Sequence, residues 1–210
     1  MKIGKKLLTT LGIATLVSCT PQESPTEITS TDKNLVIENI MSRRSIRKYK
    51  DTLIEREKLD QIITCGINAP NGRNLQSWEV RVVDNPTLFN EIKENMAQAH
   101  PELNPEEVKG CFRGAPVMIF IARDTTYDFS AYDCGLMAQN IMLSAWSLGI
   151  GSICLGSPIR YLTENEACKP ILQRMNFSEN YQLCLCIGLG YADENPDAKP
   201  RDINKVQYLQ

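Results

Sequence analysis

Residues 42–49 are Ser-Arg-Arg-Ser-Ile-Arg-Lys-Tyr, and they place four cationic side chains and two serine hydroxyls in eight positions. The planar guanidinium group of arginine matches the geometry of a phosphate, and Ser45 can add a hydroxyl donor. If the segment is extended, Arg43, Ser45 and Arg47 share one face. The alternative is a solvated basic turn after a helix, so the remaining sequence has to distinguish a turn from an anion site.

The positive charge at residues 43–48 is local. The chain has a formal net charge of −2, and loss of an N-terminal segment carrying Lys2, Lys5 and Lys6 would bring this charge to −5. A net acidic domain argues against nucleic acid as a partner.

Residues 1–18 have the pattern of a bacterial secretory signal, with a lysine-rich start and an apolar run from Leu7 to Val17. The run is shorter than the roughly 20 residues that a membrane span needs. Its end, Leu16-Val17-Ser18-Cys19, resembles a lipobox, which implies cleavage before Cys19 and lipidation of that residue. An ordinary signal peptide with a chance cysteine is the alternative.

Residues 19–33 are rich in Pro, Ser, Thr and Glu, so we expect a flexible linker there and a folded domain over residues 34–210. Together with the lipobox, this organisation predicts an extracytoplasmic lipoprotein on the periplasmic or outer-membrane side. The lipid anchor would be its only contact with the membrane.

The eight cysteines form no CxxC pair, and the chain has a single histidine, His100, so a zinc site is not expected. With Cys19 lipidated, seven cysteines remain and at least one is unpaired. Most of them lie in apolar runs and are expected to be small buried hydrophobic residues.

The hydrophobic periodicity predicts an α+β fold with a mixed central sheet flanked by helices. Strands are expected at residues 78–83, 117–122 and 182–191, the last with Cys184 and Cys186 on one face. Capping boxes are expected at Thr52–Glu55 and at Ser130–Asp133, the second opening a long, apolar helix that ends at Gly149. Asn104 is expected to cap a short helix that begins at Pro105.

Two loops and a tail carry further candidate residues. Residues 69–78, Ala-Pro-Asn-Gly-Arg-Asn-Leu-Gln-Ser-Trp, offer carboxamides that suit a flat heterocycle, although an Asn/Gly turn feeding a strand is an equal alternative. Gly156 could admit a ligand close to the backbone. Lys199 and Arg201 add positive charge near the C-terminus.

Taken in order, these landmarks resemble the nitroreductase family of FMN flavoproteins over about residues 35–209. The resemblance rests on residues 43–49, 69–78 and 133–151, the Cys154-Leu155-Gly156 turn, and Lys199-Pro200-Arg201. It implies an intertwined homodimer of nitroreductase-like fold with two FMN sites at the subunit interface.

The resemblance also implies which residues bind FMN. The phosphate and ribityl chain would be held by Arg43, Arg44, Ser45 and Arg47, with Lys199 and Arg201 returning to the phosphate. The flavin would be contacted from the other subunit by Pro70, Asn71, Gly72, Asn74 and Gln76, while Leu155 and Gly156 would lie against the isoalloxazine ring. Many members carry an acid where this chain has Leu155, which affects the expected substrate and donor preference.

The implied activity is ping-pong transfer of hydride or electrons from a donor through FMN to a nitroaromatic, quinone or enone, with no catalytic side chain required. NAD(P)H is scarce outside the cytoplasm, so a quinol or a redox protein is an alternative donor. A lipoprotein that binds a flavin or another phosphorylated ligand without turnover is the second hypothesis. A structural lipoprotein that has lost the site is the third.

Overall fold

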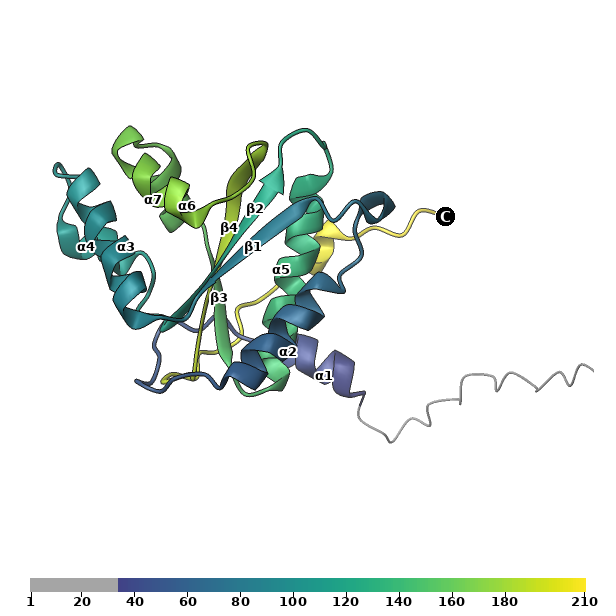
Figure 1. The fold of residues 1–210 in the computed structure, drawn as a ribbon. Coiled ribbons are helices and arrows are strands. Elements are labelled where there is room, and N and C mark those ends of the chain that lie inside the picture. Colours follow the sequence, from purple (N-terminus) through teal and green to yellow (C-terminus); the bar gives the residue numbers. More distant parts are fainter. Residues whose placement is uncertain (1–33) are drawn as a thin grey trace, which may run out of the picture. The chain divides into compact units, whose positions relative to one another are not determined.

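The computed structural model describes residues 34–210, whose core is a four-stranded sheet with helices on both faces (Figure 1). The expected signal peptide, the lipidation of Cys19 and the linker lie outside the described residues. The strands lie in the order β1-β2-β4-β3. Their bounds are β1 (Trp78–Val83), β2 (Val117–Asp124), β3 (Gly151–Leu155) and β4 (Tyr181–Gly190).

Seven α-helices occur within residues 34–210, and none of them is long and apolar enough to cross a bilayer. They are α1 (Leu35–Ser42), α2 (Arg56–Ile67), α3 (Pro86–Ala99), α4 (Pro105–Gly110), α5 (Ser130–Ser147), α6 (Ser157–Thr163) and α7 (Lys169–Met175). Short 3₁₀ turns lie at Gly72–Asn74, Glu166–Cys168 and Ile203–Lys205.

The α+β class is confirmed, but the sheet is antiparallel rather than mixed: β1–β2, β2–β4 and β3–β4 all pair antiparallel. Strands β1 and β2 are joined by two successive helices, α3 and α4, and this connection brings the chain back in the opposite direction. The single helix α5 does join parallel strands, β2 and β3, but β4 lies between them. The one parallel pairing in the described part of the chain is an isolated bridge between Ser45 and Ser152.

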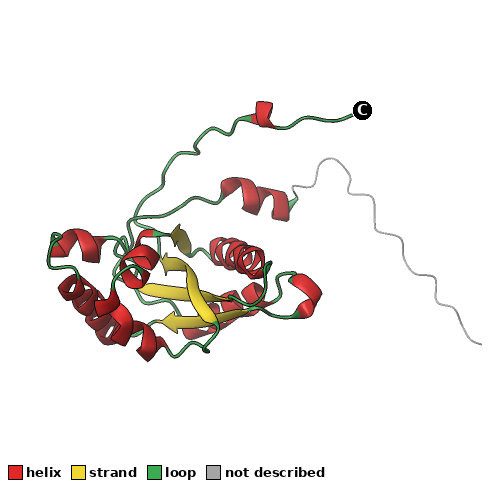
Figure 2. Cartoon of the chain, turned by 90° about the horizontal axis from the view of Figure 1, so that it is seen from above, coloured by secondary structure: helices red, strands yellow, loops and turns green. Residues whose placement is uncertain are grey.

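Two hydrophobic clusters bury the two faces of the sheet. Phe120 and Cys186 face α3, α4, α6 and α7, whereas Ile119 and Ile187 face α2 and α5. Strand β2 is fully buried from Val117 to Ala122, as expected of a strand covered on both faces. Figure 2 shows the helices on both sides of the sheet, with α1 and the C-terminal segment extending away from it.

Of the three helix caps predicted from local sequence, one is present in the structure and two are not. Asn104 caps α4 as predicted, since its Oδ1 accepts a hydrogen bond from the Glu106 amide at 2.9 Å. The capping boxes at Thr52–Glu55 and Ser130–Asp133 are wrong. Helix α2 begins after Glu55 without a side-chain cap, and α5 begins after Phe129, also without one. The Asp133 carboxylate binds a distant loop instead.

The expectation that Cys184 and Cys186 share a face is also wrong. The register of β2 and β4 shifts between Ile121, which pairs with Leu185, and Ala122, which pairs with Leu183. Cys184 is therefore the extra residue of a β-bulge, and it packs with the α5 side while Cys186 belongs to the opposite cluster.

Gly188 gives a stability test of the packing beneath β4. A Cβ atom at this position would lie 2.8 Å from the Cβ of Ala115. We expect Gly188→Ala to lower the free energy of unfolding by about 1–3 kcal/mol through overpacking. Because Ala115 is the nearest obstruction, the double variant with Ala115→Gly should recover much of this loss. Additive losses in a double-mutant cycle measured by chemical denaturation would contradict the contact.

Candidate functional site

The basic stretch is extended and lies along the outer edge of β3. Ser45 bridges to Ser152, the Ile46 amide donates to the Ser152 carbonyl at 3.0 Å, and Tyr49 bridges to Ala192. Ile46 is 1% exposed, so its side chain points into the protein while its neighbours in sequence do not. The stretch is therefore a strand-like segment on the sheet edge and not a solvated turn.

Arg43, Arg44 and Arg201 gather at this edge, and within residues 34–210 no ion pair to a carboxylate neutralises them. The Nη1 atom of Arg43 is buried and has no hydrogen-bond partner within residues 34–210. Burial lowers the pKa of Arg43, and the nearby charges of Arg201 and Arg44 lower it further. Arg44 donates to the carbonyls of Met41 and Arg43, and Arg201 donates to those of Lys199 and Pro200. Carbonyl groups do not cancel these charges, so the cluster suits an anion.

A second buried polar atom without a partner lies in the segment that pairs with the basic stretch. Ser152 is fully buried, and its Oγ makes no hydrogen bond within the described residues. Sequence reasoning missed this residue, although a serine inside an apolar strand is the signal that could have found it. Unpaired buried polar groups are costly, and two in one neighbourhood indicate a bound polar ligand.

The turn after β3 leaves room for a ligand at its backbone. A Cβ atom on Gly156 would meet nothing within 4 Å, and its φ of −98° is open to any residue, so the glycine is not required by the fold of this chain. The Leu155 side chain is only 7% exposed and packs in the core. Little of Leu155 is therefore open to a ligand within this chain, and its effect on substrate preference stays a prediction. The neighbouring Cys154 is exposed and lies close enough to Arg43 to oppose, in small part, the lowering of the Arg43 pKa.

The loop at residues 70–76 has an unusual backbone. Arg73, Asn74 and Gln76 have φ values of 54°, 55° and 52°, a region that L-residues other than Asn and Asp rarely adopt. For Arg73 and Gln76 this conformation costs about 1–3 kcal/mol each, and such residues persist only where the surroundings hold them, commonly at functional sites. The Asn71 Oδ1 accepts from the Gln76 amide at 2.9 Å and closes the loop on itself. The side chains of Asn74 and Gln76 are exposed.

Asp133 holds this loop to α5. Its Oδ1 accepts from the Gly72 amide at 3.0 Å, and its Oδ2 accepts from the Ser77 hydroxyl at 2.6 Å. Asp133 and Ser77 are 3% and 2% exposed, so water does not compete for these bonds. A carboxylate that accepts two donors fixes the loop more firmly than neutral acceptors would.

Tyr127 fixes Gly72 from a second direction. A Cβ atom on Gly72 would lie 2.0 Å from the Tyr127 hydroxyl oxygen, so no larger residue fits without displacing that ring. Sequence reasoning assigned Gly72 to ligand contact, whereas within this chain its lack of a side chain serves packing.

The two halves of the predicted site lie at opposite ends of α5. Asp133, in its first turns, holds the loop, whereas the Leu143 carbonyl accepts from Asn39 and the Trp146 indole donates to Ser42, which fixes α1 and the basic stretch. At 1.5 Å per residue, the 13 residues from Asp133 to Trp146 span about 20 Å. One chain therefore does not bring the loop and the arginines together.

Arg47 and Lys199 are peripheral to the cluster. Arg47 is exposed and donates to the Ser45 carbonyl at 3.2 Å, while its amide is bound by Glu194. Lys199 and Pro70 are exposed, and no side-chain contact places either of them at the arginines. Their assignment as cofactor-binding residues remains a prediction.

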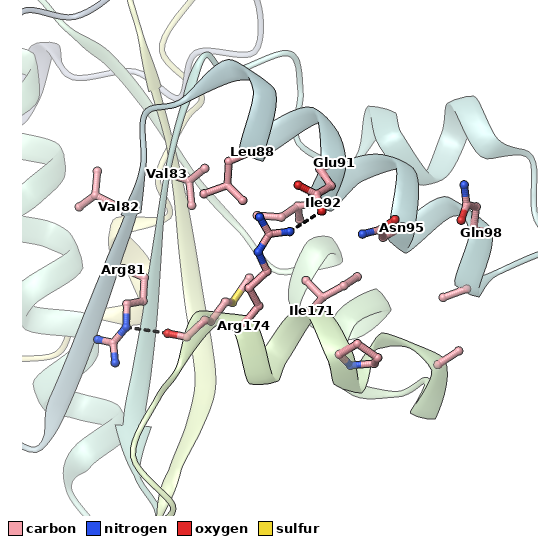
Figure 3. A pocket seen from close by; sticks show the side chains of 14 residues that line it. Arg81, Val82, Val83, Leu88, Glu91, Ile92, Asn95, Gln98, Ile171 and Arg174 are labelled. Atoms are coloured by element: carbon pink, nitrogen blue, oxygen red, sulfur yellow. Dashed lines mark hydrogen bonds and ion pairs between the residues drawn. The ribbon is translucent and has the colours of Figure 1, made fainter.

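A separate cavity of about 700 Å³ lies between α3, α7 and the edge strand β1, and Figure 3 shows its lining. Arg174 and Glu91 form an ion pair across it, and the Arg81 Nε donates to the Met175 carbonyl at 2.7 Å. None of the predicted site residues lines this cavity, so it is separate from the arginine cluster.

Comparison with known proteins gives the family. Residues 40–191 match the model of the nitroreductase family. An NADPH-flavin oxidoreductase of Vibrio harveyi is 31% identical over 174 residues, which cover 80% of this chain and 70% of that protein. The chain therefore belongs to the nitroreductase family.

Solved structures of nitroreductases have the same fold as this chain. A nitroreductase from Desulfitobacterium hafniense DCB-2, crystallised with bound FMN, superposes with a TM-score of 0.75 at 30% identity, covering 85% of this chain and 100% of that one. An FMN-dependent nitroreductase from Clostridium difficile R20291 gives a TM-score of 0.66 at 32% identity, covering 83% and 99%. The nitroreductase-like fold expected from the sequence is confirmed.

The role of Asp133 can be tested on the loop itself. We expect Asp133→Ala to leave the Gly72 amide and the Ser77 hydroxyl unpaired, and to lower the free energy of unfolding by about 1.5–3 kcal/mol. Hydrogen exchange at residues 72–77 should accelerate. Asp128→Asn, at an exposed position two residues before α5, is the control and should change neither quantity. Unchanged exchange in the Asp133 variant would remove it as the anchor.

Proposed function

We propose that this chain is an FMN-dependent oxidoreductase that passes electrons from a donor to a nitroaromatic, quinone or enone acceptor. Its membership of the nitroreductase family supports the enzyme class and the cofactor. The single structural observation that carries the proposal is the Nη1 atom of Arg43, which is buried without a hydrogen-bond partner in the described residues and lies near the charges of Arg44 and Arg201. A dianionic phosphate supplies the charge and the acceptors that this cluster lacks.

The residues present fit FMN. Arg43, Arg44 and Arg201 would hold the phosphate, with the Ser45 and Ser152 hydroxyls as donors and Arg47 and Lys199 at the rim. The open backbone at Leu155 and Gly156 would admit the ring. When bound, FMN supplies the redox chemistry, since it accepts and returns electrons in pairs. The protein's own part is to bind, orient and exclude water, and no side chain is asked to act as nucleophile or base.

The loop at residues 70–76 completes the site from a second copy of the chain. Within one chain it lies about 20 Å along α5 from the arginines, and its carboxamides at Asn71, Asn74 and Gln76 suit the edge of a heterocycle. Asp133 and Tyr127 hold Pro70, Gly72 and the rest of the loop in shape. This would explain the strained backbone of the loop, because that conformation presents the carboxamides to the other subunit.

A homodimer also accounts for exposed apolar surface. Helix α1 has no buried residue, and Leu35, Val36 and Met41 are 77%, 68% and 71% exposed. The C-terminal segment likewise exposes Tyr208 and Leu209. Isolated apolar arms of this kind mark an interaction surface, and a second copy would cover them. Light scattering that gave a monomeric mass for the purified domain would contradict this.

Donor and acceptor would bind in turn at the same face of the site. The oxidised donor would leave before the acceptor binds, and this order gives ping-pong kinetics. In the proposed location, outside the cytoplasm and anchored by a lipid on Cys19, NAD(P)H is not the natural donor, and a quinol or a redox protein takes its place. The Vibrio relative is named for NADPH, so the donor is the point on which this chain could differ.

The activity is tested by an anaerobic titration of the purified protein. We expect flavin absorbance that bleaches with at least one of NADH, NADPH and a quinol, and that returns on addition of a nitroaromatic, quinone or enone. Bound FMN that no donor reduces would favour the alternative, a ligand-binding lipoprotein without turnover. Protein without flavin that takes up no added FMN would refute both.

Arg43→Met separates the binding role from a structural one. Loss of charge-assisted bonds worth about 1.5–3 kcal/mol each should weaken FMN binding roughly 10- to 150-fold. The stability of the protein without FMN should not fall, because the change removes a buried charge that repels Arg44 and Arg201. Arg174→Met, in the separate cavity, is the matched control. Equal FMN affinity in wild type and Arg43→Met would exclude the assignment.

The anchor is tested by Cys19→Ala. If Cys19 carries the lipid, this variant should leave the membrane fraction on cell lysis, whereas Cys65→Ser, a cysteine inside the folded domain, should stay with it. Membrane association that persists in the Cys19 variant would argue against lipidation.

A further inference from the structure

Three aromatic side chains form a row beside the loop at residues 70–76. The Tyr127 hydroxyl lies against Gly72, where an added Cβ atom would be 2.0 Å from it. The ring centroids of Tyr127 and Phe129 are 5.9 Å apart, and those of Phe129 and Tyr132 are also 5.9 Å apart, with the rings tilted against one another. Phe129 and Tyr132 are 59% and 70% exposed, so these two rings contribute little to the core.

Arg73, the residue after Gly72, is the only charged residue of this loop. Its side chain is exposed and makes no hydrogen bond or ion pair with any residue from 34 to 210. Its backbone has a φ of 54° and a ψ of 18°, and it is held in place because the Asp133 carboxylate accepts a hydrogen bond from the adjoining Gly72 amide. A fixed backbone therefore carries an uncommitted guanidinium group next to the row of rings.

We propose that Arg73 and the exposed rings of Phe129 and Tyr132 recognise the electron acceptor, and that the preferred acceptor is an aromatic acid. The inference rests on the proposed function, in which this loop reaches the FMN site of a second copy of the chain. An aromatic acceptor can pack face-on or edge-on against exposed rings. The planar guanidinium group matches a carboxylate, which it can bind through two hydrogen bonds.

Arg73 sets the chemistry of the ligand. Rings alone would accept any flat apolar molecule, and a second subunit alone could cover them. Neither gives a partner to the cation that the loop holds beside the rings, whereas a carboxylate on the acceptor does. Because Arg73 is exposed, its ion pair with the acceptor stays partly solvated, so we expect it to contribute about 2- to 5-fold and to weaken at high salt.

The test uses 4-nitrobenzoate and its neutral methyl ester. Full-length protein loaded with FMN is reduced anaerobically with a stoichiometric amount of dithionite, so no natural donor is needed, and reoxidation by each compound is followed by flavin absorbance. Reduction of the nitro group to a nitroso group takes up two electrons and two protons and releases water. The two compounds differ in intrinsic reactivity, so the ratio of their second-order rate constants, acid over ester, is compared between wild type and variants.

We expect Arg73→Met to lower this ratio about 2- to 5-fold. Arg113→Met is the matched control and should leave the ratio unchanged, because Arg113 is also exposed and has a φ of 58° but lies in the turn after α4. If both compounds reoxidise the protein with the same ratio in wild type and Arg73→Met, this inference fails while the proposed function stands. If FMN does not bind, or if neither these compounds nor a quinone reoxidises the protein, the proposed function fails.

Phe129→Leu tests the rings. If acceptors pack against Phe129, the concentration that gives half the maximal reoxidation rate should rise roughly 2- to 10-fold for the acid and the ester alike. If Phe129 serves only contact between subunits, the variant should instead shift the mass seen by light scattering toward the monomer. Unchanged saturation by both compounds would remove the rings from the acceptor site.

A binding measurement needs no turnover. Calorimetry on the oxidised protein compares benzoate with the neutral benzamide, neither of which carries a nitro group. We expect the ratio of the two dissociation constants to shift about 2- to 5-fold against benzoate in Arg73→Met and to stay constant in Arg113→Met. The same ratio in wild type and Arg73→Met would overturn the recognition of an acid by Arg73, whether or not the protein turns over an acceptor.

Discussion

Helix α5 holds both the polar loop at residues 70–77 and the segment that leads into the basic stretch. Its apolar surface is buried against the sheet and α2, so the helix cannot shift without opening the core. Near its start, the Asp133 carboxylate holds Gly72 and Ser77. Near its end, Leu143 and Trp146 hold Asn39 and Ser42, and thereby α1 and the arginines that follow it. One rigid element thus sets the separation between a strained polar loop and a cluster of positive charge.

The cluster of Arg43, Arg44 and Arg201 is electrostatically unfavourable within the chain alone. Arg43 has a depressed pKa because it is partly buried beside other cations, and its Nη1 has no partner in the described part of the chain. Such an arrangement is unfavourable until an anion arrives, and it is tolerated because the extended segment is fixed on both sides, by Ser152 of β3 and by Ala192 after β4. The local positive charge in an otherwise acidic chain matches the single phosphate of the proposed cofactor.

Residue patterns predicted the elements well and their connections less well. The apolar run of β2, the cap at Asn104 and the extended basic stretch follow from local chemistry. The capping box at Ser130–Asp133 failed because tertiary partners, the Gly72 amide and the buried Ser77 hydroxyl, take the carboxylate instead of the local amide. The sheet is antiparallel because β4 inserts between β2 and β3, and no local signal reports strand order. Ser152 and the bulge at Cys184 were missed for a related reason, since both depend on partners far away in sequence.

The distance along α5 has a thermodynamic consequence. If the arginines of one chain and the loop of another complete each site, cofactor binding and subunit association are linked equilibria. The cofactor then strengthens the pair of chains by the same free energy by which pairing strengthens its own binding. Dilution would release cofactor and separate the chains together, so the apparent affinity for FMN would depend on the concentration of the protein itself.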